Sequence, residues 1–345
     1  VYKRQTDTWS DFAREAGAGM VVHGTYALTG GELRIDAAFS DAESGTLLRA
    51  MEPVSGDVAS PMEVVEALQP RLLGALAMEF DPGLSPYVDQ VLHSPTDAAA
   101  REFARGAGLY LVDEEFAAAT ASFLRAHELD PAFYSALVMA YWAGMNDRTA
   151  NGLGRLDSIR SILARHQSEL TLYEQVLLRG WRARESGDLE GMIQQYQEAC
   201  TMAPGEKACF NLGRNLYAEL NDPGRAIQVL TTRLTPEPGW MRGWRGYWNA
   251  LAQAELVAGE YGMALSTARR GRELNPESSV FEDLVLRALA ALGRVEEGFS
   301  FLQDTLTHAW GGFGEVASDF GDALLLFQET AEARRAWAMS AEWYG

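Results

Sequence analysis

Lysine, cysteine and long apolar segments are scarce in this sequence of 345 residues. Only Lys3 and Lys207 are lysines, and every other basic residue is arginine. Cys200 and Cys209 are too few for a disulfide-stabilised scaffold or a zinc site made of cysteines alone. No apolar segment approaches the roughly 20 residues of a membrane-spanning helix. Disulfide-rich, four-cysteine zinc and membrane-inserted classes are therefore not expected.

Positive charge is also limited, because 29 Lys and Arg stand against 48 Asp and Glu, a formal net charge of −19. Such a surface repels phosphate backbones and anionic lipid headgroups, so neither nucleic-acid binding nor membrane-surface binding is expected. The apolar fraction of 47% and the charged fraction of 22% are typical of globular proteins. The length allows about two domains.

Motifs that carry catalysis are missing as well. There is no Gly-x-Ser-x-Gly, no phosphate-loop Gly-Lys-Ser/Thr and no His-Glu-x-x-His, and none of the five histidines is paired at i,i+4. Gly17-Ala18-Gly19 precedes a predicted strand, so we interpret it as the end of a helix and not as a dinucleotide loop. The sequence therefore predicts no catalytic residue, no cofactor and no metal site.

The first five residues differ in character from the rest. The abundance of Ala, Gly and Arg suggests a GC-rich bacterial genome, whereas residues 1–5, when back-translated, resemble the end of a sequencing adapter. We interpret them as an adapter remnant, and we expect the natural protein to extend upstream.

Residues 6–90 show mixed periodicity, which predicts a small α+β domain. A short helix is expected around Trp9 and Phe12, and Gly30-Gly31 suits a two-residue hairpin turn. A helix is predicted from residue 61 to residue 80, with a kink or break at Pro70. Three runs predict a meander of strands: residues 20–29, 32–41 and 46–51.

Parts of this region resemble a known family. The stretch from Arg14 to Tyr26, followed by residues 33–42 and by Gly45-Thr46-Leu47-Leu48, is similar to the TolB amino-terminal-like domain, which couples bacterial regulators to repeat arrays. The resemblance implies that residues 6–90 are a truncated copy without a preceding strand and helix. It also implies that the exposed sheet edge results from truncation and that the domain has no catalytic residue.

Residues 96–345 follow a helical pattern that repeats about every 34 residues. In the copy that begins at Ala100, seven positions carry the expected large, small or proline residues: Phe103, Ala107, Tyr110, Ala119, Phe123, Ala126 and Pro131. The pattern recurs from Tyr173, Lys207 and Arg245, and more weakly from Ser279 and Phe313. A longer unit lies between Ala132 and Leu172.

This pattern resembles the tetratricopeptide repeat, in which small residues let paired helices approach and proline ends the second helix. The resemblance implies a right-handed α-solenoid of about six to seven helix pairs over residues 96–345. The predicted fold class is therefore mainly α, with a small α+β domain of three strands and helices at the N-terminus.

The resemblance also implies a concave groove, lined by positions 2, 5, 9 and 12 of each first helix. Asparagine amides there can bond a peptide backbone, while Trp181 offers an aromatic anchor and Arg287 a cation for one partner carboxylate. A solvated polar face is the alternative interpretation. The candidate groove residues are Trp181, Arg184, Asn211, Asn215, Asn249, Gln253, Asp283 and Arg287.

Two further features receive structural interpretations. Cys200 and Cys209 flank the turn at Pro204, and two buried free thiols are favoured over a disulfide. Trp240, Trp244 and Trp248 have i,i+4 spacing, and core packing is favoured over a stacking ladder for a ligand.

These observations predict a non-enzymatic module of a bacterial regulatory protein that binds a protein or peptide partner in the groove. Two alternatives stay open. The chain could be the sensor tail of a larger enzyme, a serine/threonine kinase or a nucleotide cyclase, as the combined resemblance implies. It could also be an accessory subunit of a cell-envelope complex. The sequence leaves the compartment and the oligomeric state undetermined.

Overall fold

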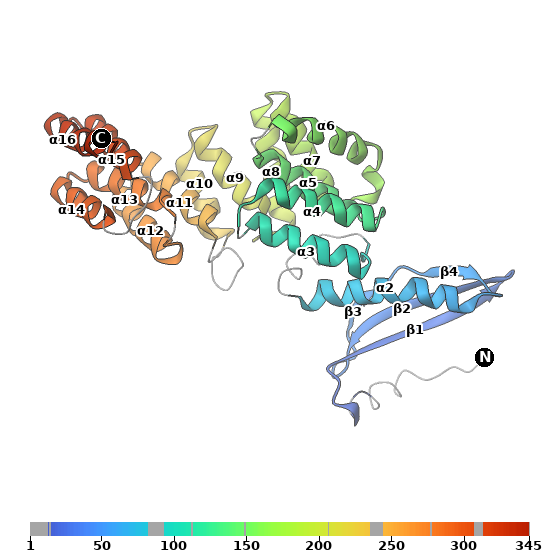
Figure 1. Ribbon diagram of the computed structural model, residues 1–345. Coiled ribbons are helices and arrows are strands. Elements are labelled where there is room, and N and C mark those ends of the chain that lie inside the picture. The colour runs from blue at the N-terminus through green and yellow to red at the C-terminus, as the bar shows by residue number, and fades with distance from the viewer. Residues whose placement is uncertain are drawn as a thin grey trace. The chain divides into compact units, whose positions relative to one another are not determined.

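The computed structural model describes residues 13, 15–81, 93–111, 113–147, 150–205, 207–234, 244–276, 278–306 and 313–344 (Figure 1). The chain forms two compact units, unit 1 with residues 1–174 and unit 2 with residues 175–345. The helix predicted around Trp9 and Phe12 lies outside the described residues, apart from its end.

The elements of unit 1 are β1 (Met20–Thr29), β2 (Glu32–Asp41), β3 (Leu47–Ala50), β4 (Val54–Asp57), α2 (Pro61–Phe80), α3 (Asp97–Leu111), α4 (Phe116–Leu129), α5 (Tyr134–Asn146), α6 (Ala150–Arg165) and the 3-10 helix η2 (Gln167–Glu169). Helix α7 (Leu172–Glu185) begins in unit 1 and continues into unit 2. The other elements of unit 2 are α8 (Leu189–Met202), α9 (Lys207–Ala218), α10 (Pro223–Thr232), α11 (Arg245–Val257), α12 (Tyr261–Leu274), α13 (Val280–Ala291), α14 (Val295–Leu306), α15 (Phe313–Leu326) and α16 (Thr330–Tyr344).

The sheet of unit 1 is antiparallel and centred on β2. Strands β1 and β2 pair along their whole length, from Met20 with Asp41 to Thr29 with Glu32, because Gly30-Gly31 closes the hairpin with φ of 60° and 90°. The other side of β2 pairs with β3 near one end and with β4 near the other. The predicted meander of three strands was therefore incomplete, since β4 is too short to show an alternating pattern.

Helix α2 lies along the sheet (Figure 1) and packs with apolar residues of β2 in one core cluster. It begins with Pro61 at a position where no backbone donor is needed, and it continues through Pro70. Leu68 and Ala75, on either side of Pro70, are both buried in the sheet–helix core. The predicted break at Pro70 is wrong, because packing on both sides of the proline holds the helix together.

Helix α2 also contacts α3, and this contact joins the sheet to the first helix pairs. A Cβ atom on Gly74 would collide with the backbone of Pro95, so only glycine permits this approach. The Phe103 ring of α3 lies 5.2 Å from Phe123 of α4 and 5.1 Å from Phe133. The two compact units divide between residues 174 and 175, so the sheet, α2 and the first helix pairs belong to one unit. The predicted domain boundary near residues 90–96 stays a prediction.

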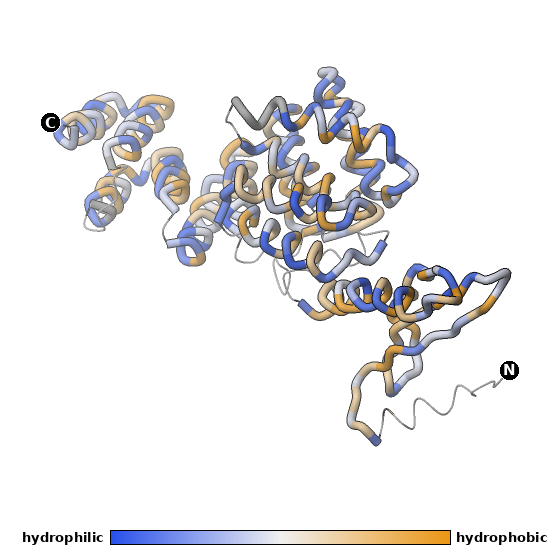
Figure 2. The backbone as a smooth tube through the Cα atoms, turned by 45° about the vertical axis from the view of Figure 1, so that its right-hand side comes forward, coloured by the Kyte–Doolittle hydropathy of each residue, from blue (hydrophilic) through white to orange (hydrophobic). Residues whose placement is uncertain are grey.

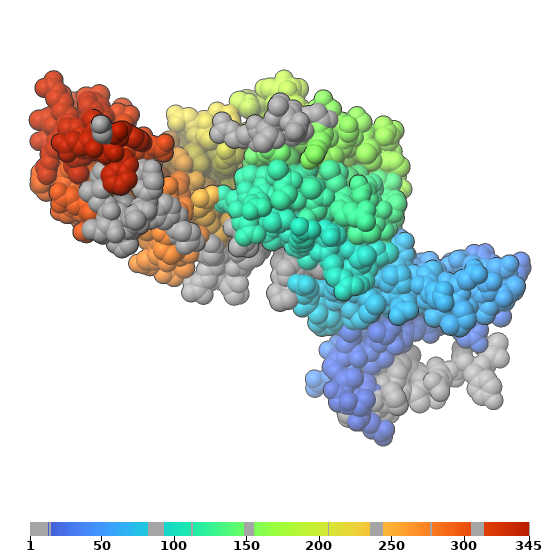
Figure 3. Space-filling model, in the orientation of Figure 1, coloured from blue at the N-terminus to red at the C-terminus, as the bar shows by residue number. Residues whose placement is uncertain are grey.

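Unit 2 consists of helix pairs whose turns follow from local sequence. The α7–α8, α11–α12 and α13–α14 turns place Gly187, Gly259 and Gly293 at φ of 78°, 79° and 67°, a region that favours glycine. Asp188 and Asp222 cap α8 and α10 by accepting hydrogen bonds from backbone N–H groups three residues ahead. First helices α9, α11, α13 and α15 contact one another in sequence order. Figure 3 shows the surface of unit 2 passing from yellow through orange to red along the chain.

Hydrophobic and hydrophilic residues alternate along these helices, as amphipathic packing requires (Figure 2). The protein is mainly α, with a small antiparallel sheet domain followed by helical repeats, and this confirms the predicted fold class. Among the described residues, no helix is long and apolar enough to cross a membrane.

Candidate functional site

Small residues fix the orientation of the first helices of unit 2. A Cβ atom on Gly213 of α9 would lie 2.6 Å from Leu230 Cγ of α10, and Ala252 of α11 is fully buried. A Cβ atom on Gly321 of α15 would collide with Trp337 of α16. Successive residues are rotated by about 100° around a helix axis. The residue that follows each of these small ones therefore points to one side of the helix pair and not at the paired helix.

The residues that follow these small ones, and others on that side of the first helices, are at least partly exposed. We call this surface the first-helix face. It consists of Arg214 and Tyr217 on α9, Asn249 and Gln253 on α11, Asp283 and Arg287 on α13, and Asp319 and Asp322 on α15.

Two predicted groove residues lie on α7, and only one of them is accessible. Trp181 is 2% exposed, so it is a core residue and not the predicted aromatic anchor. Its neighbours Val176 and Leu177 are also buried, because α7 is enclosed over much of its circumference. Arg184 is exposed near the end of α7, with its Nη2 4.0 Å from Glu219 Oε1.

On α9 the predicted positions are displaced by one residue. Asn215 is 2% exposed, and its Nδ2 donates a hydrogen bond of 2.7 Å to the Asn211 carbonyl one turn earlier. Asn211 itself is half-buried. The assumed register placed Arg214 against the paired helix, whereas the structure places Gly213 there. Arg214 is exposed instead of Asn215, and the prediction for Asn215 is wrong.

The sequence contained a signal for the correct register. The copy that begins at Arg245 carries the large–small pair Leu251-Ala252, and α9 carries the matching pair Leu212-Gly213. Aligning these two pairs would have moved Arg214 to the groove position. The predicted register was set by Tyr217 and Ala226 instead. It was displaced because the turn between α9 and α10 is one residue longer than the turn between α11 and α12.

The two predicted residues of α11 stay on the first-helix face. Asn249 and Gln253 are both half-buried, and Gln253 Nε2 donates a hydrogen bond of 3.1 Å to Asn249 Oδ1. Trp248, one residue before Asn249, is partly buried against the core cluster of α11, α12 and α13. This contact supports the structural interpretation of Trp248, while Trp240 lies outside the described residues.

Asp283 and Arg287 of α13 are brought together with residues of α15. Arg287 Nη1 lies 3.6 Å from Asp283 Oδ2, so the guanidinium is already engaged by a carboxylate of its own helix. Burial raises the pKa of Asp283, and Asp319 raises it further, while Arg287 opposes both. Burial, Asp322 and Glu315 likewise raise the pKa of Asp319. Sequence reasoning missed Asp319, because the repeat from Phe313 was too weak to assign groove positions.

At the other end of unit 2, arginines gather around α9. Burial raises the pKa of Tyr196 in α8 to about 12, and the charges of Arg184 and Arg214 oppose this shift. Both guanidinium groups therefore lie close enough to act on one phenol. The first-helix face thus carries a cation at α9, amides at α11, and mostly carboxylates at α13 and α15.

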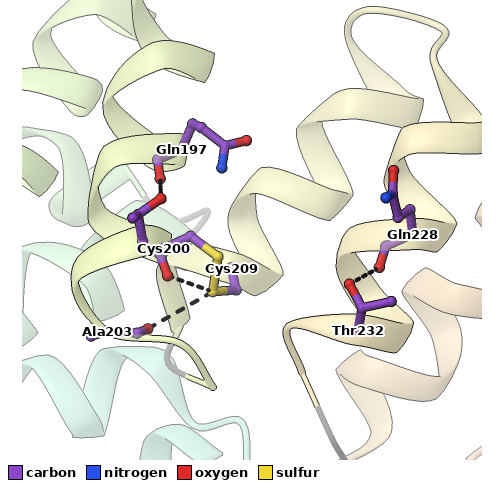
Figure 4. The surroundings of a disulfide bond; sticks show 7 residues. Gln197, Cys200, Ala203, Cys209, Gln228 and Thr232 are labelled. Atoms are coloured by element: carbon purple, nitrogen blue, oxygen red, sulfur yellow. Dashed lines mark hydrogen bonds between the residues drawn. A yellow bond between two sulfur atoms is a disulfide. The ribbon is translucent and has the colours of Figure 1, made fainter.

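The two cysteines are joined by a disulfide, contrary to the predicted free thiols (Figure 4). Cys200 lies near the C-terminal end of α8 and Cys209 near the N-terminal end of α9, and both side chains are almost fully buried. Their Cα atoms lie 4.7 Å apart, within the normal range for a disulfide. The bond fixes the turn that leads into the first helix carrying Arg214.

The described residues contain no group of three or more His, Cys, Asp or Glu placed to hold a metal ion. The buried Glu174, whose pKa is raised to about 7 by burial, has a structural explanation. It accepts hydrogen bonds from Thr171 N and Oγ1 at 2.8 Å and 3.0 Å, while its own N–H donates to Thr171 Oγ1. This is a capping box at the start of α7.

No family model matches the chain, and no curated protein matches it. Among solved structures, it is similar to a tetratricopeptide repeat protein from Parabacteroides merdae, with 15% identity, TM-score 0.41, and coverage of 71% of this chain and 93% of that one. The C-terminal part of a repeat protein from Cytophaga hutchinsonii gives 16% identity, TM-score 0.43, and coverage of 68% and 93%. At these scores, the fold assignment rests on the helix packing of the chain itself.

Proposed function

We propose that this chain is a non-enzymatic protein-interaction module that binds a segment of a partner protein on the first-helix face of unit 2. The observation that carries the proposal is the row of polar side chains on four consecutive first helices. The opposite sides of these helices carry buried apolar residues, such as Leu216, Leu251 and Val285. Core packing therefore accounts for the apolar residues of these helices. It does not account for the row of polar residues, which is available to bind a partner.

The amides of α11 suit a peptide backbone. Each carboxamide offers both a donor and an acceptor, and the hydrogen bond between Gln253 and Asn249 uses only one donor and one acceptor of the pair. Peptide recognition by main-chain hydrogen bonds does not demand a particular side chain.

The experiment is selection of a displayed library of random 12-residue peptides on the immobilised full chain, followed by affinity measurement for the enriched peptides. Asn249→Ala with Gln253→Ala should weaken binding by roughly 1–3 kcal/mol, because a few neutral hydrogen bonds are lost. The matched control is Gln197→Ala with Gln228→Ala, two exposed amides on second helices α8 and α10. Binding that survives the first pair and is lost with the control pair would refute the proposal.

A second candidate function is a sensor tail attached to an upstream enzyme, and one observation favours it. The Cys200–Cys209 disulfide supports an oxidising compartment, where such a tail would meet its ligand. Labelling of thiols in freshly fractionated cells tests this candidate. Free Cys200 and Cys209 in the native protein would count against an extracytoplasmic sensor.

A further inference from the structure

The charges of the first-helix face are sorted along unit 2. On α9, Arg214 is exposed, and the described residues provide no ion pair for it. On α11 the face has only neutral amides. On α13 and α15, Asp283, Asp319 and Asp322 stand against the single cation Arg287.

Arg287 does not neutralise this end of the face. Its guanidinium lies 3.6 Å from Asp283, and this leaves Asp319 and Asp322 of α15 in excess. Asp319 is exposed, and Asp322 Oδ1 accepts a hydrogen bond of 3.0 Å from Trp337 Nε1, which is a neutral donor. A partner carboxylate at Arg287 would therefore meet three carboxylates, whereas a partner cation would relieve their repulsion.

We propose that the face binds an extended partner segment in a single direction, with a carboxylate over Arg214 and a lysine or arginine over Asp283 and Asp319. This inference rests on the function proposed above and adds the charge pattern of the partner. It also moves the partner carboxylate from Arg287, where sequence analysis expected it, to Arg214. Opposite charges at the two ends fix both orientation and register, because the reversed segment meets like charges at each end.

Helix spacing sets the distance between the two charges of the partner. Packed helices lie about 8–10 Å apart, so α9 and α13, separated by α11, are on the order of 20 Å apart. An extended chain rises about 3.3 Å per residue and spans this distance in about six residues. The intervening backbone then passes over Asn249 and Gln253.

The test uses the peptides selected on the full chain and two exposed charge reversals, Asp319→Lys and Arg214→Glu. Peptides selected on the wild type should carry an acidic and a basic residue about six positions apart. Each reversal should weaken their binding by roughly fivefold at low salt, and less at high salt, as expected for exposed ion pairs. Glu342→Lys and Arg334→Glu on α16, which are matched reversals of exposed residues that are not part of the face, should leave affinity unchanged. Melting curves confirm that all four variants fold.

The outcomes separate this inference from the proposed function. If affinity depends on Asn249 and Gln253 but neither face reversal changes it beyond its α16 control, the charge pattern is wrong and the peptide-binding function stands. If Asp319→Lys strengthens binding of the selected peptides, the orientation is reversed and the inference is overturned. If no peptide is enriched whose binding depends on Asn249 and Gln253, both the function and the inference fail.

Discussion

The sheet of unit 1 and the helix pairs of unit 2 leave different side chains at their surfaces. Strand β1 exposes Val22, Leu28 and Tyr26, the last at 76%, and borders an open apolar pocket of about 490 Å³, because α2 packs mainly against β2 and β4. The first-helix face of unit 2, by contrast, presents mainly amides and charged side chains. A sheet needs a second layer to cover its face, whereas a helix pair hides its apolar seam by itself. Substitutions should therefore change the free energy of unfolding by different amounts in the two regions.

The largest contrast is expected between the helix seam and strand β1. Ala226 of α10 is fully buried, so Ala226→Trp should overpack the α9–α10 seam and cost about 3 kcal/mol of unfolding free energy. Tyr26→Ala removes a mostly exposed ring from β1 and should stay within about 0.5 kcal/mol of wild type. Denaturant unfolding followed by circular dichroism measures both, and wild-type stability of Ala226→Trp would show that the assigned seam is wrong.

Two buried carboxyls, one in unit 1 and one in unit 2, give the next effect. Burial raises the pKa of Glu174 and of Glu255 from 4.5 to about 7. In both cases the folded state holds the proton more tightly than the unfolded state, so stability is greatest below pH 4.5 and is lost as pH rises toward 7. For the almost fully buried Glu174 the loss is on the order of 2–3 kcal/mol.

Glu174→Gln should remove most of this pH dependence, because a carboxamide stays neutral. The measurement is the difference in unfolding free energy between wild type and variant at pH 5 and at pH 8. A constant difference across this window would mean that Glu174 keeps an ordinary pKa in the folded protein.

The disulfide of unit 2 is expected to give a smaller effect. Replacing both Cys200 and Cys209 by alanine releases a short loop between α8 and α9 and should cost roughly 2 kcal/mol. Thermal unfolding of wild type with and without a reducing agent checks the result independently of the substitutions. Equal melting temperatures of the oxidised, reduced and doubly substituted proteins would contradict it.

The smallest expected effect separates two asparagines. Asn215→Ala removes a buried side chain that bonds the Asn211 carbonyl, so it should lower the unfolding free energy by about 1 kcal/mol. Asn249→Ala lies on the first-helix face and should change stability by less than about 0.5 kcal/mol. Equal losses of unfolding free energy in the two variants would mean that Asn249 contributes to the folded core as much as Asn215 does.

The sequence predicted the two regions with unequal success for physical reasons. The β1–β2 register was predictable, because Gly30-Gly31 fixes the hairpin and alternation fixes the faces. Strand β4 was not predicted, because Val54 to Asp57 is too short for a periodic signal. The unbroken helix through Pro70 depends on contacts that only the folded sheet provides.

In the helical repeats, periodicity predicted the helix pairs, but it did not predict for every helix which side chains are exposed. A shift of one residue rotates a side chain by about 100°, which is enough to exchange Arg214 for Asn215. The burial of Trp181 follows from the packing of α7 and could not be read from spacing. Asn249, Gln253, Asp283 and Arg287 lie on the partly exposed side of their helices, whereas Ala252 and Leu286 are buried. Their role in binding stays a prediction.

Hydrogen–deuterium exchange of the full chain, with and without a saturating selected peptide, tests most directly whether the first-helix face is the binding surface. Slower exchange concentrated in α9, α11 and α13, with α10, α12 and α14 unchanged, is the predicted result. Slower exchange confined to the second helices or to strand β1 would contradict the account.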